Sequence, residues 1–163
     1  MTWAVRGARL LTAVAEPVVE VGPGHCEAEV DGVIDDGGGG CGPLAALAAT
    51  VTSGVLPDGR PALVLAVDMP RVSVPLLSLL AGHHAAASVV PVDRAGRWQP
   101  LCARWSADGL REAAALVERG ERSMRALLAA VAVTPLLPED WEPIGGADAL
   151  IDVDTPADVE ALA

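Results

Sequence analysis

The sequence predicts an α/β domain of three layers, with helices on both faces of a mainly parallel sheet. Apolar runs of strand length alternate with segments of helical periodicity, at the spacing of β–α–β crossovers. One run, residues 62–67 (ALVLAV), is apolar at every position, as expected for a central parallel strand covered on both faces. The chain has 163 residues, of which 52% are hydrophobic and 20% charged, and this composition excludes a disordered chain. We therefore expect a single domain over residues 1–163.

Local patterns, taken in order along the chain, predict the elements of that domain. The helical spacing of Val5, Leu10 and Val14 predicts a first helix, which Pro17 ends. Serine or proline marks the start of most later helices, because serine can cap a helix and proline in the first turn costs no hydrogen bond. The expected helices are 2–15, 44–52, 73–81, 110–119 (capped by Ser106), 123–130 and one that starts at Thr155. The expected strands are 18–21, 32–35, 62–67, 87–92, 100–104, 131–135 and 149–153, with an irregular proline-rich stretch up to Gly146.

The charge balance is strongly acidic and contains no lysine. Eleven arginines face 22 acidic residues, which gives a net charge of −11. Since nucleic acid needs a positive protein face, we expect no nucleic-acid partner. No apolar run reaches the roughly 18 residues of a membrane helix, and no signal peptide is visible, so we expect no membrane association and a cytoplasmic location. The three cysteines lie far apart without a CxxC pair, which predicts buried thiols and no disulfide framework.

Carboxylates follow three of the expected strands. Ligands of open α/β sheets bind outside the carboxyl ends of the strands, and Asp68 directly follows the strand 62–67. Asp36 follows the second strand, and Asp152 and Asp154 lie at the last one. Because Mg²⁺ usually takes one or two carboxylates plus substrate phosphates, Asp68 is the sharpest candidate ligand, and Asp152 or Asp154 could supply a second. A turn aspartate at 68 and an ordinary helix start at 154 remain the alternative interpretations.

Two glycine segments differ in what they predict. The four glycines 37–40 fit neither GxxxxGK[ST] nor GxGxxG, so a flexible linker is the better interpretation. Gly42-Pro43 opens a helix, where backbone N–H groups can face a ligand. No serine or cysteine has a visible base partner, so the sequence indicates no nucleophile.

Five segments, in order, resemble the molybdenum cofactor guanylyltransferase family. Together they cover the chain from about Val18 to its end. The segments are 41–47 (CGPLAAL, similar to GPLAGL), 65–70 (LAVDMP, similar to a metal-binding CDMP strand end), 98–103 (WQPLCA, similar to QPLCA), 120–128 (GERSMRALL, similar to GERSLRALL) and 151–159 (IDVDTPADV, similar to NVNTPEDL).

The resemblance implies a Rossmann-like nucleotidyltransferase fold and a reaction. The family transfers GMP from GTP to the terminal phosphate of the molybdopterin-type cofactor and releases pyrophosphate, with Mg²⁺ bridging phosphate oxygens. The implied partners are GTP, that cofactor and a molybdoenzyme that receives the product. By resemblance, the site residues are Asp68 as catalytic metal ligand, Asp36 as a nucleotide contact, Gly42, Pro43 and Leu44 near base and ribose, Gln99 and Pro100 in the acceptor part, and Asp152 and Asp154 where the family often has asparagine.

The start of the sequence departs from the family pattern. Family members open with a strand and an LAGGxSxRMGxDK loop that holds the triphosphate, whereas residues 2–11 already resemble the later GRPLLERV helix, so the first strand is missing from this sequence. Two explanations stay open: a start assigned too late in the gene, or a shortened relative that binds the cofactor or a partner protein without turnover. A related cytidylyltransferase is the nearest variant, although Asp68-Met69-Pro70 favours the guanylyl branch.

Overall fold

The computed structural model describes residues 1–35 and 41–153. In these ranges the helices are α1 (Trp3–Thr12), α2 (Pro43–Thr52), α3 (Val74–Ala81), α4 (Ala107–Glu118), α5 (Met124–Ala130) and α6 (Pro138–Gly145), with a short 3₁₀ helix η1 (Glu27–Glu29). The strands are β1 (Val19–Val21), β2 (Gly32–Ile34), β3 (Ala62–Leu65), β4 (Ser88–Pro91), β5 (Cys102–Trp105) and β6 (Val133–Leu136). None of the helices in this part of the chain is both long and apolar enough to cross a membrane.

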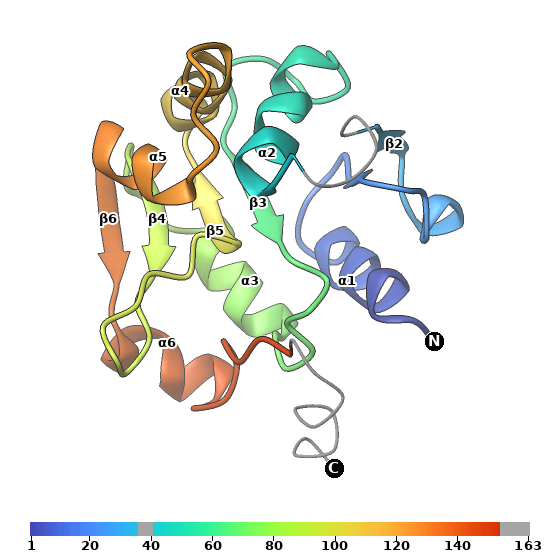
Figure 1. The fold of residues 1–163 in the computed structure, drawn as a ribbon. Helices are drawn as coiled ribbons and strands as arrows, with labels where there is room; N and C mark the ends of the chain where they lie inside the picture. The colour runs from blue at the N-terminus through green and yellow to red at the C-terminus, as the bar shows by residue number, and fades with distance from the viewer. Residues whose placement is uncertain (36–40, 154–163) are drawn as a thin grey trace.

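The strands form two sheets (Figure 1). The larger sheet has the order β3-β5-β4-β6; β5 runs antiparallel to both of its neighbours, while β4 and β6 are parallel. β1 and β2 make a separate parallel pair in which Glu20 lies opposite Val33. β3, β4 and β6 therefore share one direction, and their carboxyl ends meet at the same end of the sheet.

Helices cover both faces of the larger sheet, which confirms the three-layer α/β prediction. α2, α4 and α5 lie above the sheet in Figure 1, and α1, α3 and α6 lie below it. The upper helices enclose a core around Leu44, Trp105 and Leu127, and the lower helices enclose one around Leu76, Leu80 and Trp141. Burying one leucine side chain stabilises the folded state by roughly 1.5–3 kcal/mol, so the two cores hold the layers together.

The prediction of a central, parallel strand at residues 62–67 is wrong. The strand ends at Leu65, pairs antiparallel with β5, and occupies one edge of its four-stranded sheet. All four of its residues are only half-buried, whereas those of β4 are all buried. An apolar pattern reports that both faces meet helices, but it does not report how many neighbouring strands are present.

The proline-rich stretch before Gly146 is a helix, α6, and not an irregular segment. Pro138 occupies its first turn, and the Asp140 carboxylate accepts a hydrogen bond from the Leu137 N–H at 3.3 Å. Trp141 anchors the helix, because its side chain is buried and its Nε1 donates to the Val92 carbonyl oxygen at 3.0 Å. The contacts of the tryptophan, which are tertiary, outweigh the local signal of the prolines.

Residues 149–153, expected as a strand, form a turn and an extended segment without a ladder. Ala149 and Leu150 are buried against the lower core, so packing accounts for their apolar character. The helix expected from Thr155 onward lies outside the described residues.

The first turn of α4 approaches β4 closely. Ser106 caps the helix, because its Oγ accepts from the Gly109 N–H at 3.0 Å, and the Ser106 N–H donates to Ser88 Oγ at 3.0 Å. A Cβ on Gly109 would lie 2.7 Å from Ser88 Oγ and 3.2 Å from Trp105 Cε3. The narrow space between α4 and the sheet therefore requires glycine at position 109.

Two glycine substitutions should have opposite effects on stability. Gly109→Ala should lower the free energy of unfolding by about 1–3 kcal/mol, because the added methyl group has no room. Gly7→Ala, in α1, should raise it by about 0.5–1 kcal/mol, because the new Cβ would meet only Leu65 Cδ2 at 3.9 Å. Urea unfolding of both variants provides the measurement. A stabilised Gly109→Ala protein would contradict the close approach of α4 to β4.

Candidate functional site

Asp68 lies in the loop that follows β3, next to the segment that carries Asp152. The Val153 N–H donates to the Asp68 carbonyl oxygen at 2.9 Å, so the two segments that carry these aspartates lie side by side. Asp68 is half-buried and Asp152 is exposed. Met69, which follows Asp68, is buried in the lower core. The carboxylate-bearing segments predicted at two distant points of the sequence are thus brought together.

The loop after β3 is held at both of its ends. At its start, the Ala66 N–H donates to the Leu101 carbonyl oxygen at 2.8 Å. At its end, Arg6 Nη2 of α1 donates to the Val72 carbonyl oxygen at 2.7 Å. Asp68 therefore projects from a loop that is fixed to β5 on one side and to α1 on the other. The role of Arg6 was not visible in the sequence, because it depends on the packing of α1 against the start of α3.

Gln99 and Pro100 precede β5 at the same end of the sheet. The Gln99 N–H donates to the Pro91 carbonyl oxygen at 2.8 Å, and the Pro100 carbonyl oxygen accepts from Trp105 Nε1 at 3.0 Å. Together with the bond between Ala66 and Leu101, these contacts place 99–101 beside the end of β3. We call the segments 66–69, 99–101 and 152–153 the rim.

Asp93 organises the turn that leads to Gln99. Its carboxylate accepts hydrogen bonds from the N–H groups of Ala95 (2.8 Å) and Arg97 (2.9 Å), from Arg97 Nε (2.7 Å) and from Gln99 Nε2 (3.3 Å). Burial would raise the pKa of Asp93, but the hydrogen bonds and the positive charge of Arg97 outweigh it, so the pKa lies below its ordinary value. These side-chain bonds could not be predicted from the sequence, because they depend on how the turn folds back on itself.

The start of α2 supplies the predicted Gly42, Pro43 and Leu44. Gly42 has φ 81°, which favours glycine, and Pro43 occupies the first helical turn. Both are exposed, but the Leu44 side chain is fully buried in the upper core, so only its main chain can meet a ligand. The N–H groups of Ala45 and Ala46 already donate to the Gly42 carbonyl oxygen, at 3.1 and 3.2 Å.

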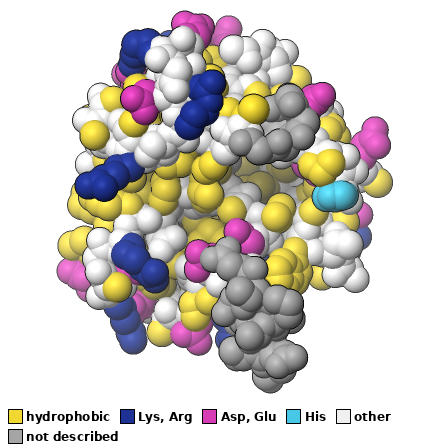
Figure 2. All heavy atoms as spheres, viewed as in Figure 1, with side chains coloured by type: hydrophobic (Ala, Val, Ile, Leu, Met, Phe, Trp, Pro, Cys, Tyr) yellow, Lys and Arg dark blue, Asp and Glu magenta, His cyan; other side chains and the backbone are white. Residues whose placement is uncertain are grey.

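The predicted site residues divide into three sets. Asp68, Asp152, Gln99 and Pro100 share the rim, and Gly42 to Leu44 lie at the start of α2 on the upper helix layer. Asp36, Asp154 and the glycines 37–40 lie outside the described residues. Figure 2 shows a hollow lined by hydrophobic side chains in the middle of this face, over the end of β3 and between α2 and α3. The roles of the individual residues stay predictions.

The rim carries two carboxylates, those of Asp68 and Asp152. Residues 1–35 and 41–153 contain no group of three or more His, Cys, Asp or Glu side chains placed to hold a metal ion. Mg²⁺ needs fewer protein ligands than that, since it commonly binds one or two carboxylates and takes its other oxygens from phosphate and water. The assignment of Asp68 and Asp152 as ligands of such an ion stays a prediction.

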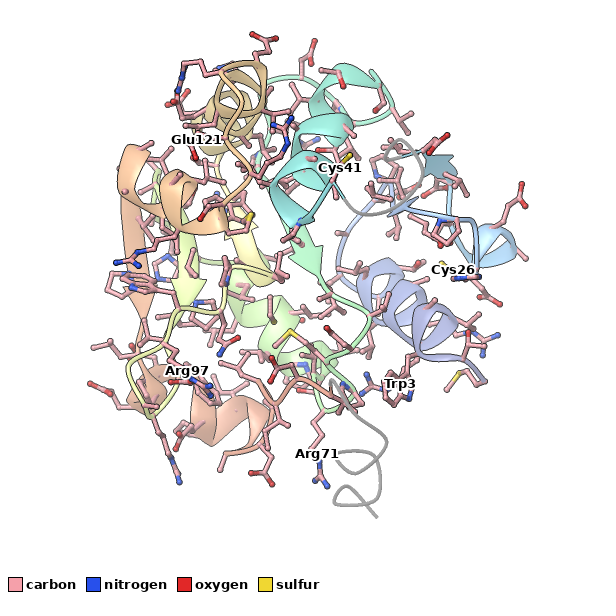
Figure 3. The ribbon with its side chains drawn as sticks, in the orientation of Figure 1. Trp3, Cys26, Cys41, Arg71, Arg97 and Glu121 are labelled. Carbon is pink, nitrogen blue, oxygen red and sulfur yellow. The ribbon has the colours of Figure 1, made fainter. Side chains whose placement is uncertain are left out.

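Three arginines of the described residues, Arg71, Arg97 and Arg122, are already engaged. Arg97 Nε lies 2.7 Å from the Asp93 carboxylate, and Arg71 lies 3.9 Å from that of Asp148. Arg122 Nη1 donates to the Glu121 carbonyl oxygen at 2.7 Å. Figure 3 shows Arg71 at the lower border of the molecule, away from the centre of this face. A phosphate at the rim would therefore compete with existing partners for each of these three arginines.

Two of the three cysteines have thiols with a raised pKa. Burial raises the pKa of Cys102 to about 12, and burial together with Glu20 raises that of Cys26 to about 12, so neither thiol ionises near neutral pH. Cys41, just before α2, is exposed, which corrects the expectation that all three thiols are buried (Figure 3). All three are free, as the absence of a disulfide framework predicted.

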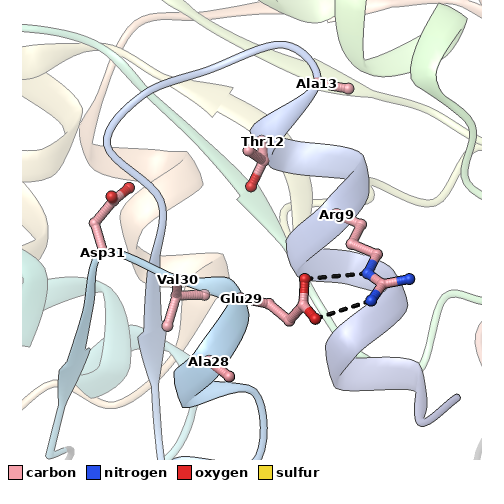
Figure 4. A pocket seen from close by; sticks show the side chains of 7 residues that line it. All are labelled: Arg9, Thr12, Ala13, Ala28, Glu29, Val30 and Asp31. Carbon is pink, nitrogen blue, oxygen red and sulfur yellow. Dashed lines mark hydrogen bonds and ion pairs between the residues drawn. The ribbon is translucent and has the colours of Figure 1, made fainter.

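One pocket of the described residues lies away from the rim. It has a volume of about 540 Å³ and lies between α1 and the segment 28–31 (Figure 4). Arg9, which lines the pocket, forms a bidentate ion pair with Glu29, with Nε 3.1 Å from Oε2 and Nη2 2.9 Å from Oε1. None of the predicted site residues lines this pocket.

The fold and the rim define an α/β protein of the kind that binds ligands at the carboxyl ends of its strands. The chain belongs to the MobA-like NTP transferase domain family, whose sequence profile matches residues 1–135. This membership and the structural likeness below confirm the family and the nucleotidyltransferase-type fold predicted from the sequence.

Two curated relatives are named "Probable molybdenum cofactor guanylyltransferase". The protein from Opitutus terrae is 34% identical over 133 residues, which cover 80% of this chain and 66% of that protein. The protein from Mycobacterium avium is 36% identical over 160 residues, covering 94% of this chain and 77% of that protein. The chain thus spans about two thirds to three quarters of the length of these relatives.

Two crystal structures share the fold. Molybdopterin-guanine dinucleotide biosynthesis protein A from Archaeoglobus fulgidus superposes with a TM-score of 0.70 at 20% identity, covering 96% of this chain and 82% of that one. A protein from Aquifex aeolicus superposes with a TM-score of 0.73 at 16% identity, covering 93% and 78%. At these identities the likeness establishes the architecture.

Removing the Asp93 carboxylate should loosen the turn beside the rim. Asp93→Ala should lower the free energy of unfolding near neutral pH by about 1.5–3 kcal/mol, because bonds to a charged group are lost. Asp93→Asn, which keeps an acceptor oxygen, should lose less.

The effect should also depend on pH. A carboxyl whose pKa is lowered by folding stabilises the native state above its unfolded pKa, and that contribution disappears as the pH falls through the folded pKa. The difference in stability between wild type and Asp93→Ala should therefore begin to shrink below about pH 4, the unfolded pKa, and keep shrinking as the pH falls toward the lower pKa of the folded state. Denaturant titrations at pH 7 and pH 3 measure this; a difference that is constant with pH would show that the charge of Asp93 contributes nothing.

Proposed function

We propose that this protein is a nucleotidyltransferase that transfers GMP from GTP to a molybdopterin-type cofactor and releases pyrophosphate. One observation carries the proposal: in a chain of the MobA-like family, Asp68 leaves the end of β3 and its main chain is bonded to the segment that carries Asp152. The names of the two curated relatives support the choice of guanylyl transfer and of the cofactor as acceptor.

In this proposal the reaction is an in-line displacement. An oxygen of the terminal phosphate of the cofactor attacks the α-phosphorus of GTP, the bond from that phosphorus to the α–β bridging oxygen breaks, and pyrophosphate leaves. A Mg²⁺ ion held there would supply positive charge that offsets the negative charge developing on the phosphates. Asp68, with Asp152, would hold the ion, and the half-buried position of Asp68 would keep its carboxylate from being fully hydrated.

The remaining predicted residues would position the two substrates. The exposed main chain of Gly42 and Pro43 would face the nucleotide, with Leu44 contributing only its N–H group. Gln99 would face the acceptor, because Asp93 fixes the turn on which it lies. Positioning of this kind carries much of the catalysis in phosphoryl transfer, where the protein itself does little covalent chemistry.

A second candidate function is binding without turnover. It is favoured by the engagement of Arg71, Arg97 and Arg122 with carboxylates or carbonyl oxygens, which leaves the rim dependent on a metal ion for phosphate. Such a protein would bind the cofactor or a partner protein and would release no pyrophosphate.

Pyrophosphate release separates the two functions. The full chain is incubated with the molybdopterin-type cofactor, Mg²⁺ and either GTP or CTP. The transferase proposal expects release with GTP that depends on both the cofactor and Mg²⁺. Release only with CTP would reassign the nucleotide, and no release with either, from protein that still binds the cofactor, would favour the binding function.

Replacing the proposed metal ligand should abolish the transfer while the fold survives. Asp68→Ala and Asp68→Asn should each lower the Mg²⁺-dependent rate by at least about a hundredfold, or about 2.7 kcal/mol. Asp58→Asn, at an exposed position in the turn before β3, should leave the rate unchanged. The titration of bound Mn²⁺ by electron paramagnetic resonance gives a second readout, in which Asp68→Asn should weaken binding. Full activity of Asp68→Asn would refute the metal role.

A further inference from the structure

A second pocket lies at the end of the larger sheet opposite the rim. It has a volume of about 380 Å³; small-molecule sites typically measure roughly 300–1,000 Å³. In Figure 1 the arrow of β5 points to this end, where the chain enters α4, whereas the arrows of β3 and β4 point toward the rim. The residues that line the pocket include Gly59, Pro61, Ala86, Arg104, Ser106 and Arg111. None of the predicted site residues is among those that line it.

Arg104 places a positive charge in the middle of this sheet. It belongs to β5 and lies opposite Leu63 of β3 and Val89 of β4, which are both apolar. The other three residues of β5 are fully buried, and Arg104 itself is half-buried. An arginine in such a position packs its aliphatic stem against apolar neighbours and directs its charged head to the more polar side, which here is the pocket.

No carboxylate of the described residues neutralises Arg104. Its Nη1 donates to the carbonyl oxygens of Ala85 at 3.1 Å and Ala87 at 3.4 Å, while its Nε and Nη2 donate to no protein group in residues 1–35 and 41–153. Six other arginines in those ranges are ion-paired with aspartate or glutamate. Because a half-buried charge without a counter-ion is unfavourable, the site favours an anion supplied from outside the chain.

Arg111 contributes a second guanidinium that an anion could recruit. It lies in α4 and is ion-paired with Asp108, one turn earlier in the same helix. The two side chains are 61% and 87% exposed, and an ion pair so exposed to water contributes little to stability. A bound anion could therefore replace Asp108 as the partner of Arg111, and the Asp108 carboxylate would return to water.

The hydroxyl group in the pocket is already used by the fold. Ser106 is buried, and its Oγ accepts from the Gly109 N–H at 3.0 Å and lies 3.1 Å from Ser88 Oγ. Recognition in this pocket consequently depends on the two arginines. Guanidinium groups bind charged oxygens in preference to neutral hydroxyl groups, so an oxyanion is the class of ligand that suits the site.

We propose that this pocket binds the phosphate group of a small phosphorylated molecule through Arg104 and Arg111. A phosphate ester carries a charge of about −1.5 to −2 near pH 7 and can accept hydrogen bonds from two guanidinium groups at once. A carboxylate, with a single charge, would neutralise only one of the two. The volume of the pocket leaves room for the organic part of the ester. This site does not depend on the proposed transferase function.

An NMR titration of the full chain at neutral pH, without Mg²⁺, tests the proposal. The probes are inorganic phosphate and ribose 5-phosphate, and sodium chloride at equal ionic strength is the control. Both probes should give saturable shifts of the Nε–H signals of Arg104 and Arg111 and of the Ala107 amide, while the Gln99 amide in the rim stays unchanged. Ribose 5-phosphate should bind at least as tightly as inorganic phosphate. Binding of inorganic phosphate alone would overturn the assignment of a phosphorylated organic ligand.

Four variants identify the groups that bind the phosphate. Arg104→Gln and Arg111→Gln should each weaken binding by at least about tenfold, because hydrogen bonds between two charged groups are lost. Asp108→Asn removes the competing carboxylate and should tighten binding about threefold. Arg119→Gln changes the net charge equally in the same helix, at an arginine that is paired with Glu112 outside the pocket, and should leave the affinity unchanged.

Three results would overturn the proposal. One is a set of shifts that sodium chloride reproduces, which would indicate a general effect of salt. Another is unchanged affinity in Arg111→Gln, and the third is equal weakening by Arg111→Gln and Arg119→Gln, which would show a dependence on net charge alone. Should Arg104→Gln fail to fold, Arg111→Gln and Asp108→Asn decide the outcome, since both positions are exposed on α4.

Discussion

The antiparallel ladder of β5 between β3 and β4 is the interaction on which the rest of this structure depends. It joins the strand that carries Asp68 to the strand that leads to Gln99, and it brings residues distant in sequence to one end of the sheet. The side chains of β5 are divided between the two cores: Cys102 is buried below the sheet, and Ala103 and Trp105 are buried above it. The four residues of β5 therefore fix the positions of both the helix layers and the rim.

The rim reflects a balance of charges in a strongly acidic protein. Carboxylates project from its segments, and Arg71, Arg97 and Arg122 are held by other carboxylates or by carbonyl oxygens. In the proposed function, a divalent cation between the carboxylates and the phosphate would offset the repulsion that a phosphate-bearing ligand would otherwise meet. The lack of lysine in the sequence makes this dependence stronger, because arginine alone supplies the fixed positive charge.

The loops that carry the candidate site residues are held by contacts from distant parts of the chain. The loop after β3 is fixed by the hydrogen bond from Arg6 to the Val72 carbonyl oxygen and by the bond from Val153 to the Asp68 carbonyl oxygen. The turn before Gln99 is fixed by the Asp93 carboxylate.

The sequence by itself determined where most of the helices lie along the chain, because capping residues mark their starts. Ser106 and Ser123 cap the helices expected from them, and Asp68 follows the end of β3 as expected. Gln99 and Pro100 lie at the same end of the sheet because β5 is antiparallel to its neighbours, which the sequence did not predict. Tertiary structure alone decided the rest. α6 forms because Trp141 is buried, residues 149–150 pack instead of pairing, and 62–65 become an edge strand because strand neighbours are chosen by long-range pairing. Periodicity records which faces of a segment are buried; it contains no information about which strand supplies the next hydrogen bond.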